Sequence, residues 1–340
     1  MRKLILLLRK FNEYLSFISS TGLGRGEFYI DLVNEMSLNK DFKITLLVPV
    51  NAKFLPRVSK DINIIEYKSK DTRTNPFLYI ELFNIFKNNR FDIVHTHFAK
   101  ASELFFKLNK ILRLKHIATK HNPRKGKIFN KIKYVTAVSI DVSKSIKKDE
   151  VKVIYNGVSP IEIEKKQTSN DIFTLSAIGR LDKIKGFDKL IKEMSKVQNR
   201  CVLNIIGDGE EYNNLSNLIK KYKLEDRVKL AGFKENIPEI LAQSDMVIMT
   251  SLSEGFSLVM LESIFYAKLF VSTKVSGCKD ILSSKLLIED FEIASKIDDI
   301  ILNYDEYILE FEEIKHKYQS LFMLKNISDE YIKYYKYVLL

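Results

Sequence analysis

The segment Met246–Glu262, MVIMTSLSEGFSLVMLE, joins a short apolar run to a polar loop and then to a second apolar run. The run 246–250 is bounded by a turn, which predicts a buried strand, and the second run predicts a helix over 257–266. Glu254 lies in the loop, and Glu262 lies eight residues on among apolar neighbours. A carboxylate that faces the interior must be paired or hydrogen-bonded, and sugar hydroxyls are suitable donors. The alternative is an acid that complements the helix dipole, beside one exposed Glu.

The same order of short apolar run and helical segment recurs along almost the whole chain. In the first half the predicted strands are 4–8, 44–48, 62–66, 91–95, 116–119 and 134–138, with helices near 26–38, 76–89, 99–111 and 140–148. In the second half they are 173–178, 202–206, 228–230, 246–250, 269–272 and 286–288, with helices near 186–197, 210–223, 236–243, 257–266 and 292–302. Such alternation is typical of parallel sheets that helices cover on both faces. Two series predict an α/β fold of two Rossmann-like, doubly wound domains that face a cleft.

The length and one polar break in the sequence predict two domains. The chain has 340 residues, and a domain commonly holds about 100–200. The segment 156–171 contains Gly157, Pro160 and a polar run, so we place the boundary there. The predicted N-terminal domain is 1–158 and the predicted C-terminal domain is 171–322.

Composition excludes several classes of protein. The chain is 46% hydrophobic and 29% charged, as ordinary globular proteins are. Its two cysteines, Cys201 and Cys278, exclude a disulfide framework, and no Cys/His cluster has zinc-ligand spacing. The run Leu4–Leu8 ends after five residues, whereas a secretory signal needs about 7–15 apolar residues. We therefore expect a buried strand there and a cytoplasmic protein, because no stretch approaches the ~20 apolar residues of a membrane span.

The positive charge is concentrated in the first half of the chain. Residues 1–150 carry 29 basic and 14 acidic side chains, whereas residues 151–340 carry 26 basic and 29 acidic ones. The densest part, 100–133, has eleven Lys and Arg against the single acid Glu103. Apolar and basic residues mixed at helical spacing favour contact with an anionic membrane surface. The alternative is a solvated helix face, and nucleic acid is not expected because no nucleic-acid-binding motif accompanies the charge.

Two glycine-containing loops follow predicted strands in the second half. In Gly179–Gly186, GRLDKIKG, Arg180 offers a planar fork for phosphate oxygens and Lys185 offers a mobile charge. Backbone amides at the start of the following helix add to an anion site, although an ordinary structural loop is the alternative. The second loop, Gly207-Asp208-Gly209, lacks the third glycine of the dinucleotide fingerprint, and we interpret it as a turn.

Polar residues also follow predicted strands in the first half. His97 and His121 come just after neighbouring predicted strands, so the parallel arrangement places them near one cleft. A core histidine is the alternative for each of them. The loop 21–27, TGLGRGE, contains Gly24 and Gly26, which let backbone approach a phosphate or a sugar.

Taken together, these residues resemble the nucleotide-sugar glycosyltransferases of the GT-B fold, specifically the retaining family 4 (glycosyltransferases group 1). The resemblance covers nearly the whole chain and runs in order through 22–26, 92–97, 120–121, 136–139, 153–158, 179–186, 207–209, 228–233, Asp245 and 254–262. It implies that a sugar moves, with retention, from a nucleotide-diphosphate sugar to a growing cell-surface glycan or a lipid-linked acceptor. A UDP-sugar is favoured, and lipopolysaccharide and capsule assembly both fit. The segment 323–340 is expected to be a helix that crosses back to the N-terminal domain.

The resemblance also implies roles for residues on the donor side. Arg180 and Lys185, in the loop that Gly179 opens, would hold the donor diphosphate and stabilise the departing nucleotide. Glu262 would bind the ribose hydroxyls, and Glu254 would hold the transferred sugar. Amides at the start of the following helix would assist Glu254; these belong to Gly255, Phe256 and Ser257. No metal and no cofactor are expected, because the two cations take the metal's role.

On the acceptor side, the resemblance places His121 beside the reacting sugar, and His97 and Gly24 along the acceptor part of the cleft. Gly26 would approach the donor phosphates.

The chain departs from the family pattern in three places. Thr250 stands where the family often has Pro, Ala267-Lys268-Leu269 replaces a Gly-x-Pro segment, and the first loop lacks paired glycines. Two alternatives share the fold, namely a nucleotide-sugar epimerase or phosphorylase, and a non-catalytic membrane-associated scaffold. The combination of Arg180, Lys185, Glu254 and Glu262 favours the transferase.

Overall fold

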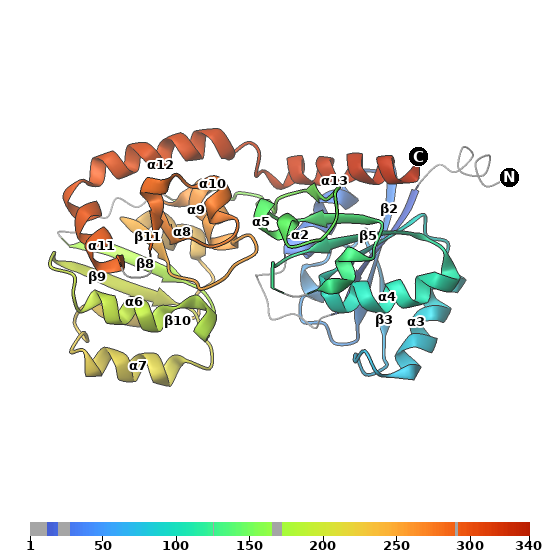
Figure 1. Ribbon diagram of the computed structural model, residues 1–340, viewed down its shortest axis with the longest axis horizontal. Coiled ribbons are helices and arrows are strands. Elements are labelled where there is room, and N and C mark those ends of the chain that lie inside the picture. The colour runs from blue at the N-terminus through green and yellow to red at the C-terminus, as the bar shows by residue number, and fades with distance from the viewer. Residues whose placement is uncertain (1–11, 20–27, 125, 165–171, 290–291) are drawn as a thin grey trace. The chain divides into compact units, whose positions relative to one another are not determined.

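The computed structural model describes residues 12–19, 28–124, 126–164, 172–289 and 292–340, which form two compact units (Figure 1). The first unit ends at Gly157 and also takes in Leu324–Leu340. The second unit is Val158–Met323. The chain enters the second unit at Val158 and leaves it after Met323. These two ends of the unit are hydrogen-bonded, since the Val158 N–H donates to the Phe322 carbonyl oxygen at 2.9 Å.

The first unit contains a parallel sheet in the order β3-β2-β1-β4-β5-β6-β7. Its strands are β1 (Asn12–Ile18), β2 (Phe42–Pro49), β3 (Asn63–Tyr67), β4 (Ile93–His97), β5 (Lys115–Lys120), β6 (Tyr134–Ala137) and β7 (Lys152–Val153). The strand order runs one way from β1 and then the other way from β4. Such a reversal is where parallel α/β sheets open a crevice at the carboxyl ends of their strands.

The second unit repeats this arrangement in the order β10-β9-β8-β11-β12-β13, again with parallel pairs. Its strands are β8 (Phe173–Ile178), β9 (Cys201–Ile206), β10 (Val228–Gly232), β11 (Met246–Met249), β12 (Phe270–Thr273) and β13 (Leu287–Ile288). The order reverses between β8 and β11. The prediction of two parallel, doubly wound sheets is therefore confirmed.

The same pair of hydrogen bonds, made by an aspartate, occurs at both reversal points. Just before β4, the Asp92 carboxylate accepts the Glu13 N–H at 2.8 Å, and the Asp92 N–H donates to the Glu13 carbonyl at 2.8 Å. Just before β11, Asp245 makes the same pair of bonds with Thr174, at 2.9 and 3.0 Å. Each carboxylate satisfies a strand-end amide that would otherwise lose its partner on burial.

Helices cover the faces of both sheets (Figure 1). The first unit has α2 (Phe28–Ser37), α3 (Pro76–Asn88), α4 (Phe98–Leu112), α5 (Ile140–Lys144) and α13 (Leu324–Leu339). The second unit has α6 (Phe187–Met194), α7 (Tyr212–Lys221), α8 (Ile237–Gln243), α9 (Leu258–Tyr266), α10 (Cys278–Ile281), α11 (Ile293–Leu302) and α12 (Tyr304–Tyr318). None of these helices is both long enough and apolar enough to cross a bilayer.

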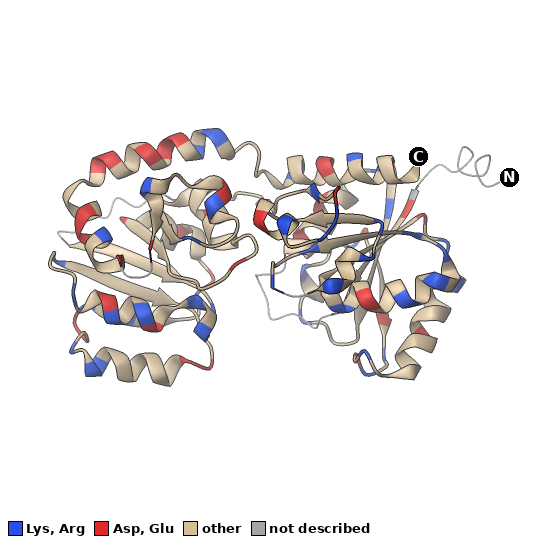
Figure 2. Cartoon of the chain, viewed as in Figure 1, with Lys and Arg blue, Asp and Glu red and all other residues tan. Residues whose placement is uncertain are grey.

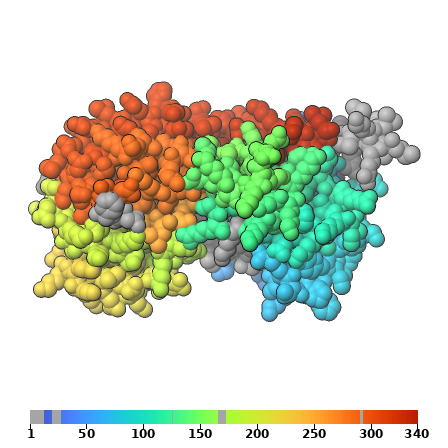
Figure 3. Space-filling model, viewed as in Figure 1, coloured from blue at the N-terminus to red at the C-terminus, as the bar shows by residue number. Residues whose placement is uncertain are grey.

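The core of the first unit lies between its sheet and helices α3 and α4. It includes the aromatic side chains of Phe17, Tyr67, Phe86 and Phe105, all 2% exposed or less. The end of the chain packs on the same unit, as the C-terminal atoms in Figure 3 show. Tyr335 of α13 lies 4.9 Å, ring centre to ring centre, from Tyr14 of β1.

The sequence located most strands within one or two residues, but it missed β1 and the short β7. The predicted strand 4–8 lies outside the described residues. The first described strand is Asn12–Ile18, an interior strand of the first sheet, whose polar residues Asn12, Glu13 and Ser16 hide its apolar character. Tyr14 and Ser16 are buried all the same, because helices cover both faces of a central parallel strand.

Candidate functional site

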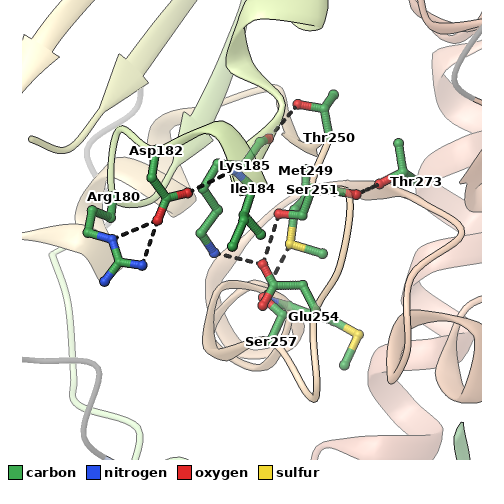
Figure 4. A network of polar contacts seen from close by, with 11 residues as sticks. Arg180, Asp182, Ile184, Lys185, Met249, Thr250, Ser251, Glu254, Ser257 and Thr273 are labelled. Carbon is green, nitrogen blue, oxygen red and sulfur yellow. Dashed lines mark hydrogen bonds and ion pairs between the residues drawn. The ribbon is translucent and has the colours of Figure 1, made fainter. Parts of the chain in front are cut away.

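The candidate donor-side residues of the second unit follow the two strands at its reversal point. Strand β8 leads directly to Gly179 and Arg180, and β11 leads to the loop that contains Glu254. Because the strands are parallel, these loops emerge at one edge of the sheet. Figure 4 shows Lys185 of the first loop and Glu254 of the second pointing toward one another, whereas Arg180 points toward Asp182.

The two loops are joined by a close backbone approach. Gly186 has a φ of +66°, and a Cβ placed there would meet the Thr250 carbonyl oxygen at 2.2 Å. The Thr250 hydroxyl donates to the carbonyl oxygens of Lys185 and Gly186, at 3.2 and 3.3 Å. The Leu252 N–H donates to the Ile184 carbonyl at 2.7 Å. Only glycine accepts this conformation without strain and leaves room for the carbonyl.

An ion pair connects the same two loops (Figure 4). The Lys185 ammonium lies 2.7 Å from Oε1 of Glu254, and the Ser251 hydroxyl donates to the same oxygen at 2.8 Å. The side chains of Lys185 and Glu254 are 20% and 16% exposed. The structure thus brings together two of the predicted site residues from positions 69 apart in the sequence. Their charges remain within reach of a ligand.

Arg180 is placed differently from Lys185. Its guanidinium makes two contacts with Oδ2 of Asp182, at 2.7 Å from Nε and 2.6 Å from a terminal nitrogen. The other oxygen of Asp182 accepts the Ile184 N–H at 3.1 Å, so the acid also holds the loop. The arginine side chain is 63% exposed. Arg180 is therefore a solvent-facing cation at the mouth of the loop.

The helix after the Glu254 loop begins as the sequence predicts. The Ser257 hydroxyl accepts the Met260 N–H at 3.4 Å and caps α9. Gly255 is buried, and the Phe256 ring packs into the interior at 5.5 Å from Phe322. Glu262 is half-buried rather than enclosed by its apolar neighbours.

The loop Gly207-Asp208-Gly209 supports the Arg180 loop. A Cβ on Gly207, whose φ is +146°, would meet the Gly179 carbonyl oxygen at 1.9 Å. A Cβ on Gly209 would meet the Leu181 carbonyl oxygen at 2.4 Å. The Leu181 N–H donates to the Asp208 carbonyl at 2.9 Å. These glycines are therefore required by backbone packing.

In the first unit, His97 and His121 come together at the carboxyl ends of β4 and β5. Nδ1 of His97 lies 3.1 Å from Nε2 of His121. His97 is 1% exposed, whereas His121 is partly exposed. The predicted proximity of these two side chains is confirmed, but Gly24 and Gly26 lie outside the described residues.

Behind this pair lies a buried polar network. His95 contacts the Tyr335 hydroxyl through Nδ1 and the Thr119 hydroxyl through Nε2, at 2.6 Å for the latter. The Thr96 hydroxyl lies 2.9 Å from Nε2 of His116. Burial lowers the pKa of His95, His116 and His121 to about 3 and that of His97 well below its usual range. The four rings are neutral at physiological pH.

Two residues beside His121 were not singled out as site residues by the sequence. Lys120 is buried, its ammonium donates to the Ser145 hydroxyl at 2.7 Å, and burial lowers its pKa. The ring of Phe98 stacks on His121 at 4.4 Å between ring centres. The sequence could have indicated Lys120 as a site residue, because it lies at the end of a predicted strand. It gave no such indication for Phe98, because its role depends on an unusual backbone angle.

Comparisons with known proteins follow the same division of the chain. The family model described as "Glycosyl transferases group 1" matches residues 159–315, and "Glycosyltransferase Family 4" matches residues 39–161. An "Uncharacterized 41.2 kDa protein in cps region" of Klebsiella pneumoniae is 26% identical over 304 residues, which span 76% of this chain and 82% of that protein. The "O-antigen biosynthesis glycosyltransferase WclY" of Escherichia coli is 26% identical over 54% of each chain.

Among solved structures, HepE of Anabaena in complex with UDP and glucose has a TM-score of 0.79. The two chains are 18% identical, and the match covers 95% of this chain and 98% of the other. This likeness establishes the shared fold.

Replacement of Gly186 by alanine should destabilise the second unit strongly. The change adds left-handed strain of about 1 kcal/mol and forces the Cβ into the Thr250 carbonyl. Gly232→Ala is the matched control, since Gly232 has a φ of +70° and nothing lies within 4 Å of its added Cβ. Urea unfolding measures the loss of unfolding free energy in both variants. Gly232→Ala reports the backbone strain alone, and the additional loss in Gly186→Ala reports the collision with Thr250. Equal losses of unfolding free energy would show that the collision does not exist.

The buried histidines should make the protein sensitive to acid. A ring whose pKa is lower in the folded than in the unfolded chain stabilises the fold above its unfolded pKa, about 6.5. This contribution disappears as the pH falls from 6.5 toward 3, by up to about 1.4 kcal/mol per pH unit for each ring. Urea unfolding at pH 7, 6, 5 and 4 measures the slope. A free energy of unfolding that stays constant over this range would contradict the neutral, buried rings.

Proposed function

The chain belongs to the group 1, family 4 glycosyltransferases of the GT-B fold, and we propose that it transfers a sugar from a nucleotide-diphosphate sugar with retention at the anomeric carbon. We favour a UDP-sugar as donor and a growing cell-surface glycan or lipid-linked glycan as acceptor. The observation that carries the proposal is the Lys185–Glu254 pair at the reversal point of the second sheet. The names of the relatives, a capsule-region protein and an O-antigen glycosyltransferase, support the acceptor class.

In this proposal the second unit binds the donor. Arg180 and Lys185 hold the diphosphate, and Gly179 makes room for the stem of Lys185, whose Cε would lie 3.1 Å from an added Cβ. Glu262 binds the ribose hydroxyls, and Glu254 holds the transferred sugar. We also assign to the donor the backbone amides of Gly255, Phe256 and Ser257, which lead into α9.

The two cations then favour the transition state over the bound donor. As the bond to the sugar breaks, negative charge grows on the departing phosphate and the sugar becomes cation-like. A fixed positive charge gains more from the developing phosphate charge than from the intact donor, so it lowers the barrier. Lys185 must exchange Glu254 for phosphate oxygens, which releases Glu254 to accept sugar hydroxyls.

The first unit supplies the other side of the reaction. We assign His121 to the neighbourhood of the reacting sugar, and His97 to its support. Gly24 and Gly26 belong to a loop that we expect to approach the acceptor and the donor phosphates.

Because Arg180 and Lys185 can supply the positive charge, we also propose that transfer needs no metal and no cofactor. Within the described ranges, no group of three or more His, Cys, Asp or Glu side chains is placed to hold a metal ion. Activity that survives exhaustive chelation supports this part of the proposal.

We propose that the basic segment 100–133 binds the anionic lipids at the inner face of the cytoplasmic membrane. In the ribbon of Figure 2, Lys and Arg positions recur along α4 and its neighbours. Lys110 and Ile111 of α4 are exposed, as is Lys131 beyond it. An exposed mixture of aliphatic and basic side chains suits the headgroup region of an anionic bilayer.

Loss of Lys185 should weaken nucleotide binding. Calorimetry of the purified chain with UDP, GDP, ADP and CMP should show micromolar binding of one nucleotide, UDP by our preference. Lys185→Ala should weaken that binding by at least about tenfold, because a charge-assisted bond to phosphate contributes about 1.5–3 kcal/mol. Lys183→Ala, an exposed lysine of the same loop, is the matched control.

The result separates the proposal from its competitors. If Lys185→Ala and Lys183→Ala bind the nucleotide equally well, the donor site is misplaced. If no nucleotide binds, the scaffold becomes the better description. An epimerase would convert its nucleotide sugar without any acceptor, which product analysis detects.

Membrane contact predicts a charge-dependent partition onto vesicles. Lys110→Glu with Lys131→Glu should reduce binding to phosphatidylserine vesicles by about tenfold or more, since each basic residue near the surface contributes about 1 kcal/mol. Lys220→Glu with Lys221→Glu, exposed at the end of α7, makes the same change of net charge in the second unit. A vesicle pelleting assay that finds equal losses for both pairs would overturn the proposed surface.

A further inference from the structure

The ring of His121 is held on two sides. The Phe98 ring stacks on it, with 4.4 Å between ring centres and 29° between planes. Nδ1 of His97 approaches its Nε2 at 3.1 Å. Among the described residues Nδ1 of His121 makes no hydrogen bond, and the side chain is partly exposed. Nδ1 is thus the ring atom that can meet a ligand.

One hydrogen is shared between the two rings, and the structure indicates which ring donates it. Both rings are neutral, because burial lowers both pKa values far below the physiological range. Each ring therefore carries one N–H and one lone pair. Either His97 donates from Nδ1 to His121, or His121 donates from Nε2 to His97.

The second arrangement leaves a buried N–H without an acceptor. If Nδ1 of His97 accepts, its hydrogen must sit on Nε2. That atom is buried and has no hydrogen-bond partner in the part of the chain that the structure describes. Buried N–H groups without a partner are rarer than acceptors with a spare lone pair, and leaving a donor unpaired is costly. The hydrogen of His97 therefore belongs on Nδ1, and that of His121 on Nδ1 as well.

The backbone at Phe98 is a second sign that the surroundings of His121 serve a function. Phe98 has a φ of +65°, the left-handed region that a bulky residue rarely adopts. Such strain persists only where the surroundings enforce it, and it gathers at functional positions. The ring that the strained backbone directs onto His121 is 36% exposed and also meets the edge of Tyr29 at 5.6 Å. It fixes the plane of His121 while His97 fixes its hydrogen.

We propose that His97 is a positioning residue that holds His121 in the Nδ1–H tautomer, so that His121 meets the substrate as a neutral hydrogen-bond donor to a sugar hydroxyl oxygen. This inference rests on the proposed function, because it describes how His121 takes part in sugar transfer. Nδ1–H is the less common form of the neutral histidine side chain in water, so the tautomer must be imposed. His121 then cannot take a proton from the acceptor hydroxyl through Nδ1.

The tautomer can be observed directly in the full-length protein. Nitrogen-15 NMR of histidine-labelled protein distinguishes protonated from bare ring nitrogens, and the spectrum of His121→Gln identifies the signals of His121. We expect a protonated Nδ1 and a bare Nε2. A protonated Nε2 would overturn the inference. This measurement needs no substrate.

Variants of His97 test the functional consequence. His97→Leu removes the donor and should lower kcat by about a hundredfold, the scale set by misplacing a reacting group by an ångström, with little change in the KM for the nucleotide sugar. His97→Asn can place an amide N–H near the position of Nδ1. It should recover about tenfold of the loss and restore the Nδ1–H signal of His121. Equal kcat values of the two variants would show that His97 only occupies space and that its hydrogen bond to His121 does not matter for turnover.

Phe98 gives a test that does not depend on turnover. Phe98→Gly removes the ring and relieves the left-handed strain, whereas Phe98→Ala removes the ring and keeps the strain. The glycine variant should therefore melt several degrees above the alanine variant. Equal melting temperatures, or a higher one for alanine, would refute the strained geometry.

The outcomes separate this inference from the proposed function. Wild-type protein that transfers sugar but shows Nε2–H on His121 overturns the inference alone. Wild-type protein that binds no nucleotide and transfers no sugar overturns the proposed function, while the NMR and melting results still decide the geometry of His97, Phe98 and His121.

Discussion

The close approach of Gly186 to the Thr250 carbonyl is the constraint on which the proposed donor site depends. It joins the loops after β8 and β11 through backbone, and so sets the separation of Lys185 from Glu254. The ion pair itself need not hold the loops together, because the cost of desolvating two largely buried charges offsets most of their attraction. A pair that weak can open for a diphosphate without disturbing the loops that carry it. Rigid backbone with exchangeable charges is what a site needs in order to bind and release a nucleotide.

The first unit solves a different problem with the same topology. His97 ends β4, one of the two strands at its reversal point, and His121 follows the neighbouring strand β5. Behind them His95 is tied to Tyr335 of α13 and to Thr119 of β5. The last helix therefore completes the polar core of the first unit. A chain without α13 would leave Nδ1 of His95 without the Tyr335 hydroxyl, and an unpaired buried polar group costs free energy of folding.

The sequence predicted both sheets because alternating apolar runs and helices report parallel topology directly. It missed β1, since Asn12, Glu13 and Ser16 interrupt the apolar pattern while Leu4–Leu8 offered a stronger one. Motifs located Arg180, Lys185, Glu254 and Glu262, but not their pairing. The contact of Lys185 with Glu254 spans 69 positions and that of His95 with Tyr335 spans 240. Such contacts, and the φ of Phe98, are consequences of packing that no local pattern carries.

The two groups of site residues differ in electrical character, and the proposed reaction accounts for that difference. The departing phosphate becomes more negative, so cations such as Lys185 belong beside it. The sugar becomes cation-like, and a protonated histidine about 4 Å away would raise the barrier by about 4 kcal/mol at the effective dielectric of a partly buried site. Burial keeps His121 neutral, and His97 leaves it with an N–H to offer a hydroxyl oxygen. In the proposed reaction, the desolvation that makes the first unit sensitive to acid is therefore also what would allow His121 to stand next to a developing positive charge.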